Sequence, residues 1–273
     1  SYIVTFDFMN KQLLFLSFLL IAFSCGREFS DENLSIFKYN EVSGINSLDP
    51  AFAKDQASIW ACSQLFNGLV QLDDSLIVRP SIAKSWKIEN DNKRYTFILR
   101  DDVLFHKSEL FIDSNQRKVT AFDFEYSFGR LIDPKLASPG AWVMSNIQSF
   151  KALSDTILLI ELHKPFPAFL ALLSMPYCSV VPEEIIVQNV FDENPVGTGP
   201  FRFQYWKQNV KLVYRKNTEY FEKGLPHLDA VAITFIKDKQ TAFLEFLKGN
   251  LDFISGIDAS YKDEVLDIEG RWQ

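Results

Sequence analysis

The stretch Asn194-Pro195-Val196-Gly197-Thr198-Gly199-Pro200-Phe201 opens the segment around which the rest of the chain is organised, residues 194–253. Its glycines and prolines predict a tight backbone turn. Two short apolar runs follow, Phe201–Trp206 and Val210–Tyr214, with polar residues between them. This arrangement predicts a β-hairpin that begins at the turn.

The hairpin is followed by a polar, aromatic segment and a turn, and then by a third strand over Ala230–Ile236. A helix over Asp238–Lys248 comes next, and Gly249 ends it, since glycine readily takes the left-handed conformation after a helix. The order is therefore turn, hairpin, strand and helix.

The part of the chain before this segment is a series of short strands and helices. Thr120 and Asp123 give a helix start of the capping-box type, and Asp133-Pro134 predicts its end. The polar Ser154-Asp155 predicts a hairpin turn. The other expected elements are strands over 34–42, 95–100, 103–106, 147–153 and 156–162, with the strands at 95–100 and 103–106 in one small antiparallel sheet, and helices over 57–66 and 165–173.

Composition sets limits on the class of protein. The chain has 273 residues, is 47% hydrophobic and contains 26 Phe, which is enough apolar material for a substantial core. Its net charge of -7 and the lack of a Lys/Arg stripe argue against a nucleic-acid binder. The Gly197–Gly199 turn lacks the Lys-Ser/Thr of a phosphate loop, and no Gly-x-Ser-x-Gly elbow marks a catalytic serine. Three isolated histidines, His106, His163 and His227, do not suggest a metal site.

The whole set of motifs resembles the family 5 extracellular solute-binding proteins, the oligopeptide, dipeptide and nickel receptors of bacterial ABC importers. Ser47-Leu48-Asp49-Pro50 and residues 80–86 resemble further signatures of that family. The residues of the opening segment that carry the resemblance are Gly197 to Phe201, Trp206, Asn217, Tyr220, Phe221, Gly224, Pro226, Leu228, Asp229, Val231, Gly249, Leu251, Asp252 and Phe253.

The resemblance implies a mixed α/β fold of the periplasmic-binding-protein class, in which two lobes close on a ligand by hinge motion. Residues 26–66 and 175–273 are expected to form a discontinuous, incomplete large lobe. Residues 67–174 are expected to form a small α+β subdomain. The family's second lobe is expected to lie beyond this sequence, and with it the acid that holds a peptide's ammonium group.

The N-terminal region resembles a lipoprotein signal peptide. Residues 1–8 read as upstream residues; Lys11 then precedes an apolar run, 13–23, that ends in Ala22-Phe23-Ser24-Cys25. This pattern predicts cleavage before Cys25 and its lipidation, so that residues 1–25 are removed. The alternative is a plain secretory signal. Of the other cysteines, Cys62 and Cys178 are expected to be buried thiols, with a long-range disulfide as the alternative.

The function implied is capture of a peptide for an ABC permease by an exported, lipid-anchored monomer, without enzymatic chemistry, cofactor, metal or nucleic acid. An extended peptide can be held through its main chain, with aromatic walls supplying contact area. Alternatives are a nickel-chelate or haem receptor of the same family, and a truncated surface or scaffold protein that does not transport. The residues predicted to contact the ligand are Lys54, Asp55, Tyr177, Cys178, Thr198, Gly199 and Trp206.

Overall fold

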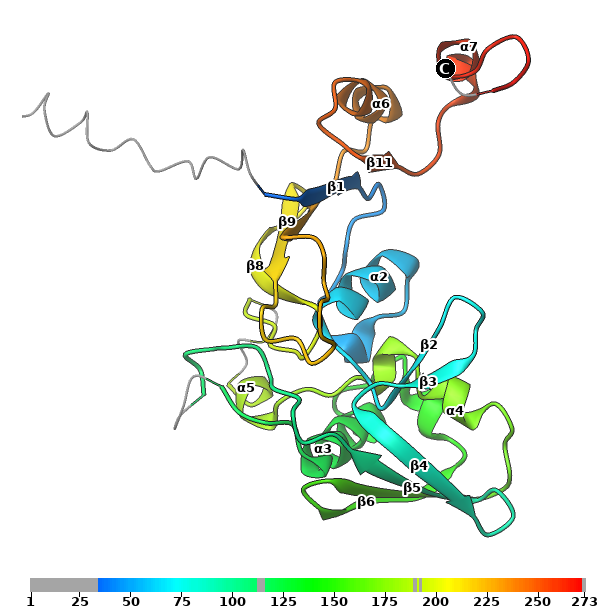
Figure 1. Ribbon diagram of the computed structural model, residues 1–273, viewed down its shortest axis with the longest axis vertical. Helices are drawn as coiled ribbons and strands as arrows, with labels where there is room; N and C mark the ends of the chain where they lie inside the picture. The colour runs from blue at the N-terminus through cyan, green and yellow to red at the C-terminus, as the bar shows by residue number, and fades with distance from the viewer. Residues whose placement is uncertain (1–33, 112–115, 189–190, 192, 272–273) are drawn as a thin grey trace, which may run out of the picture. The chain divides into compact units, whose positions relative to one another are not determined.

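The computed structural model describes residues 34–111, 116–188, 191 and 193–271, all of which except Leu34 belong to the unit Ser35–Gln273. Within these residues the main strands form two sheets, with a two-stranded β-arm besides (Figure 1). The predicted signal segment and Cys25 lie outside the described residues.

The first sheet is mixed and has the strand order β11-β1-β10-β9-β8. Strand β1 runs parallel to β10 and β11, whereas β9 runs antiparallel to both of its neighbours, β10 and β8. The predicted hairpin is confirmed as β8 and β9, and the predicted helix after the third strand is confirmed as α6. The bounds are β1 (Ile36–Asn40), β8 (Phe201–Lys207), β9 (Lys211–Lys216), β10 (Ala230–Thr234), β11 (Phe253–Ile254) and α6 (Lys239–Leu247).

Two of these strands are shorter than expected, and the side chain of Asn40 lies where they end. Its side chain accepts a hydrogen bond from the N–H of Ile236 at 2.7 Å and donates one to the carbonyl of Ile236 at 2.9 Å. The backbone polar groups of Ile236 are therefore satisfied by a side chain rather than by a neighbouring strand. This side-chain pairing follows directly after β10 ends at Thr234, opposite the end of β1 at Asn40.

The second sheet is antiparallel, in the order β4-β5-β7-β6, and helix α3 packs against β6 and β7. Phe124, Phe128 and Leu131 share one face of α3 and are buried. The predicted capping box of Thr120 and Asp123 is confirmed, and the Asp123 carboxylate accepts hydrogen bonds from the N–H and hydroxyl of Thr120. The bounds are β4 (Ala83–Glu89), β5 (Arg94–Leu99), β6 (Ile147–Ser154), β7 (Ile157–Leu162) and α3 (Ala121–Ile132).

The expected pairing of strands 95–100 and 103–106 is wrong. Strand β5 pairs with β4 and β7, and residues 103–106 make a single bridge, between Leu104 and Lys118. The N–H of Phe105 donates to the carbonyl of Arg117, and the N–H of His106 donates to the carbonyl of Gly197. These long-range hydrogen bonds draw residues 103–106 away from β5.

The remaining elements are short, apart from helix α2. Helix α2 contacts β8, and Asp55 caps its first turn by accepting the Ser58 N–H. The expected helix over 165–173 is reduced to α4. The bounds are α2 (Gln56–Leu65), α4 (Phe169–Leu172), α5 (Glu183–Ile186), α7 (Lys262–Val265), β2 (Val70–Leu72) and β3 (Val78–Pro80).

Candidate functional site

The Gly197–Phe201 turn is packed against the C-terminal end of α2. The N–H of Gly199 donates to the carbonyl of Leu65 at 2.8 Å, and the Thr198 hydroxyl lies 3.0 Å from the Asn67 side-chain oxygen. A Cβ atom added at Gly197 would lie 2.0 Å from the Leu65 carbonyl oxygen. Glycine is therefore required here because two backbone segments approach closely, not because the turn forms an open loop.

His106 also holds this turn, a role that the sequence did not indicate. Its Nδ1 accepts a hydrogen bond from the N–H of Gly197 at 3.3 Å, and its Nε2 lies 3.0 Å from the carbonyl oxygen of Gly199. A carbonyl can only accept, so Nε2 carries the proton and the ring is neutral. Burial lowers the pKa of His106 from 6.5 to about 4, and the nearby charge of Arg202 acts in the same direction.

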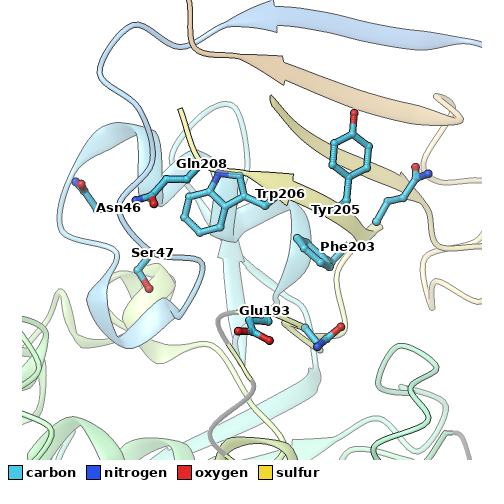
Figure 2. A pocket seen from close by; sticks show the side chains of 9 residues that line it. Asn46, Ser47, Glu193, Phe203, Tyr205, Trp206 and Gln208 are labelled. Atoms are coloured by element: carbon cyan, nitrogen blue, oxygen red, sulfur yellow. The ribbon is translucent and has the colours of Figure 1, made fainter. Parts of the chain in front are cut away.

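The turn sets the direction of β8, which is the last strand of its sheet. Along β8 lies a hollow of about 560 Å³, to which we refer as the β8 hollow (Figure 2). It is lined by Asn46, Ser47, Glu193, Asn194, Phe203, Gln204, Tyr205, Trp206 and Gln208. The lining comes from three separate parts of the sequence, which the fold brings together.

The β8 hollow combines aromatic surface with neutral polar groups. Figure 2 shows the Trp206 ring near its centre, with Asn46 and Ser47 to one side and Glu193 below. Glu193 is the single charged residue among the described lining residues. Amide and hydroxyl groups can both donate and accept, which suits a ligand that carries main-chain amides.

Trp206 has a property that stands out within this hollow. Its Nε1 atom is buried and has no hydrogen-bond partner among the described residues. A buried donor without an acceptor is costly, and native proteins rarely leave one. Because protein atoms cover this N–H, a ligand carbonyl satisfies it only after the indole or its neighbours move.

Of the seven residues predicted to contact a ligand, Trp206 is the one that lines the β8 hollow. Lys54 is exposed beyond the 3-10 turn Pro50–Phe52. Asp55 caps α2 and also accepts a hydrogen bond from the Asn46 amide at 3.2 Å, so it supports one wall of the hollow. Thr198 and Gly199 are buried in the turn described above.

Tyr177 and Cys178 lie in a buried 3-10 turn, Pro176–Cys178. A Cβ atom added at Gly140 would lie 2.4 Å from the Tyr177 ring, so this ring is closely packed. Cys62 and Cys178 are free, buried thiols, as expected, and burial raises the pKa of Cys178 to about 12. Neither thiol therefore offers a reactive thiolate.

Reasoning from sequence missed the other eight residues of the β8 hollow. The signal for four of them was present in the hairpin, because Phe203, Gln204, Tyr205 and Gln208 surround Trp206 in a polar and aromatic strand. Asn46 and Ser47 directly precede the Leu48-Asp49-Pro50 turn, whose Asp49 pairs with Arg130 at 2.6 Å. Glu193 and Asn194 carried no signal beyond their place before the glycine turn.

Two features are absent from the described residues. They contain no group of three His, Cys, Asp or Glu side chains placed to hold a metal ion. Nor do they include a helix of the length and hydropathy that crossing a membrane requires.

Comparison with known proteins gives related sequences and related structures. The dipeptide-binding protein DppE of Bacillus subtilis is 28% identical over 247 residues, covering 84% of this chain and 44% of that protein. The periplasmic murein peptide-binding protein MppA of Escherichia coli is 30% identical over 246 residues, covering 82% and 44%. The chain thus spans less than half the length of these relatives.

A solved structure, the periplasmic binding protein DppA of Helicobacter pylori in complex with the peptide STSA, has a TM-score of 0.77 and 27% identity. The match covers 86% of this chain and 49% of that one, and it confirms the expected mixed α/β fold of the periplasmic-binding-protein class. The family model described as "Bacterial extracellular solute-binding proteins, family 5 Middle" matches residues 78–271. This chain therefore belongs to the family 5 bacterial extracellular solute-binding proteins.

Proposed function

We propose that this chain forms the first lobe and small subdomain of a receptor that binds a peptide and delivers it to an ABC permease. The names of the relatives support peptide as the solute, since they are described as dipeptide-binding and murein peptide-binding proteins. Binding of this kind needs no covalent chemistry. The receptor acts by closing its two lobes around the solute.

The observation that carries the proposal is the β8 hollow itself, in which the Trp206 ring lies among neutral amides while its buried N–H has no partner among the described residues. A peptide offers a carbonyl at each residue, so an indole that turns toward the ligand can donate to it in many registers. The neighbouring amides of Asn46, Asn194 and Gln208 can complete the main-chain hydrogen bonds. Recognition through the main chain would leave the peptide's side chains free to vary.

The first experiment measures the thermal midpoint of the full-length protein with a library of di- to pentapeptides. A ligand that binds only the folded state, present at a concentration 100 times its Kd, stabilises that state by about 2.7 kcal/mol. We therefore expect a shift of several degrees with a subset of peptides. An unchanged midpoint across the library would refute a peptide receptor, and nickel or haem retained by the purified protein would support a chelate or haem receptor instead.

The second experiment replaces Trp206 by Phe, which keeps the aromatic surface and removes the N–H. Loss of one hydrogen bond to a peptide carbonyl is expected to weaken binding about five- to tenfold. The matched control is Trp86→Phe, because Trp86 lies in β4 of the other sheet and packs on Phe97. If both variants bind peptide as the wild type does, Trp206 does not bind the ligand.

We further propose that the protein is exported and anchored by a lipid on Cys25, which lies outside the described residues. Support comes from the sequence pattern around Cys25 and from the relatives described as periplasmic. Mass spectrometry of the mature N-terminus tests this proposal. A diacylated N-terminal cysteine is expected, and a mature chain that begins at another residue would refute the anchor.

The division into a large lobe, residues 26–66 and 175–273, and a subdomain, residues 67–174, is likewise our proposal. The separate origin of the two sheets supports it, because one draws its strands from 36–40 and 201–254 and the other from 83–162. Hydrogen exchange of the full-length protein tests the division, since two groups of amides with different opening free energies are expected. A single cooperative group would contradict it.

A further inference from the structure

A second, smaller pocket adjoins the β8 hollow. It has a volume of about 110 Å³, about one fifth of the volume of the hollow, and the two share Asn194 and Phe203 in their linings. Lys107, Ser108 and Arg202 also line it, and we call it the Arg202 pocket. Its size suits one functional group of a ligand rather than a whole peptide residue.

The charges of the Arg202 pocket are positive. Arg202 is exposed and has no ion-pair partner among the described residues. Lys107 forms a salt bridge with Glu219, whose carboxylate oxygen lies 3.1 Å from the Lys107 ammonium nitrogen. The hydrogen bond from Lys107 lowers the pKa of Glu219, and the charge of Arg202 adds to this effect.

His106 also lines the pocket but adds neither charge nor a free hydrogen-bonding group. Both of its ring nitrogens are engaged by the backbone of Gly197 and Gly199. The described lining contains no carboxylate, and Glu219, outside it, is the partner of Lys107. The pocket therefore presents the free guanidinium of Arg202 beside a neutral wall.

We propose that Arg202, assisted by Lys107, binds a carboxylate of the solute whose main body lies in the β8 hollow. A guanidinium presents two parallel N–H groups that match the two oxygens of a carboxylate. The Ser108 hydroxyl and the Asn194 amide can donate to the same group. The inference rests on the proposed function, and it narrows the ligand to peptides with a carboxylate that reaches this pocket.

The pocket itself is tested without any peptide, by titrating acetate into the full-length protein and following arginine Nε–H signals by NMR. One signal, assigned to Arg202 by its loss in Arg202→Gln, is expected to move and reach saturation. Lys107→Gln is expected to weaken this effect, and Lys211→Gln, at the far end of β9 and in neither lining, is the matched control. An Arg202 signal that does not saturate would overturn the proposed pocket.

The role of the pocket in ligand binding is tested with Ala-Glu-Ala and Ala-Gln-Ala, each as the free acid and as the C-terminal amide. We expect removal of one of the two carboxylates to weaken wild-type binding about tenfold, and Arg202→Gln to abolish that difference. Weaker binding of the Gln peptide shows that the pocket binds the side-chain carboxylate. Weaker binding of the C-terminal amide shows that it binds the C-terminal carboxylate. Peptides that bind equally well in all four forms would overturn the inference, whereas peptides that do not bind at all would refute the proposed function and leave the acetate result to decide the pocket.

Discussion

Replacing Gly197 by Ala tests whether the glycine turn is a packed junction with α2. The added Cβ atom would lie 2.0 Å from the Leu65 carbonyl oxygen and 2.6 Å from the Phe66 ring. Ordinary contacts with a Cβ begin at about 3.4 Å, so the backbone of the turn has to move away from α2. That movement breaks the hydrogen bond from the Gly199 N–H to Leu65.

The expected cost combines two effects. Forcing an extra carbon into a packed site costs about 1–3 kcal/mol, and leaving a buried hydrogen-bonding group unpaired costs about 1–3 kcal/mol more. We take about 4 kcal/mol as the expected loss of the free energy of unfolding. For a protein region of this size, the loss corresponds to a fall of about 8–16 °C in the midpoint of thermal unfolding.

Circular dichroism of the full-length protein during heating measures this change, and Gly129→Ala is the matched control. A Cβ atom added at Gly129, inside α3, meets no atom within 4 Å, and alanine favours the helix over glycine by about 0.8–1.0 kcal/mol. The control should therefore be slightly more stable than the wild type. If Gly197→Ala unfolds within one degree of the wild type, the turn is not packed against α2 as described.

Two more predictions concern stability. Because the pKa of His106 lies at about 4 in the folded state against an ordinary value of 6.5, the unfolded chain takes up the proton first as the pH falls. Stability from this residue is therefore full above pH 6.5 and is lost between pH 6.5 and 4, by about 3 kcal/mol. Urea unfolding at several pH values should show this loss of stability in the wild type and in the control His163→Gln, whose site is exposed. In His106→Gln the loss should be absent, and an equal loss there would contradict the assignment to His106. Asp49→Asn leaves the largely covered Arg130 without its carboxylate and should cost about 3 kcal/mol, whereas Glu161→Gln, at an exposed pair with Arg94, should cost less than about 1 kcal/mol. Similar costs for these two variants in urea unfolding would refute the importance of the buried pair.

Local patterns allowed much of the fold to be predicted. The β8–β9 hairpin and the capping box of α3 depend on residues close together in the sequence, and both are confirmed. Strand β4 was missed because most of its side chains are exposed, so Ala83–Glu89 lacks an apolar alternation. It is an edge strand, and its lysines are typical of such an edge.

The candidate site was harder to predict because its contacts join distant parts of the chain. Trp206 was identified through its place in the hairpin, but Asn46 and Glu193 reach the same hollow only through the tertiary fold. The role of His106 depends on a separation of more than 90 residues from Gly197 and Gly199. No periodicity or spacing carries that information.

The measurement that tests the account most directly is the indole N–H signal of Trp206 in the NMR spectrum of the full-length protein. The signal is assigned by its loss in Trp206→Phe and is followed during titration with a peptide that raises the thermal midpoint. We predict a saturable downfield shift with the same Kd as the thermal effect, because a peptide carbonyl accepts the unpartnered N–H. A peptide that stabilises the protein while the Trp206 signal stays in place would contradict binding in the β8 hollow.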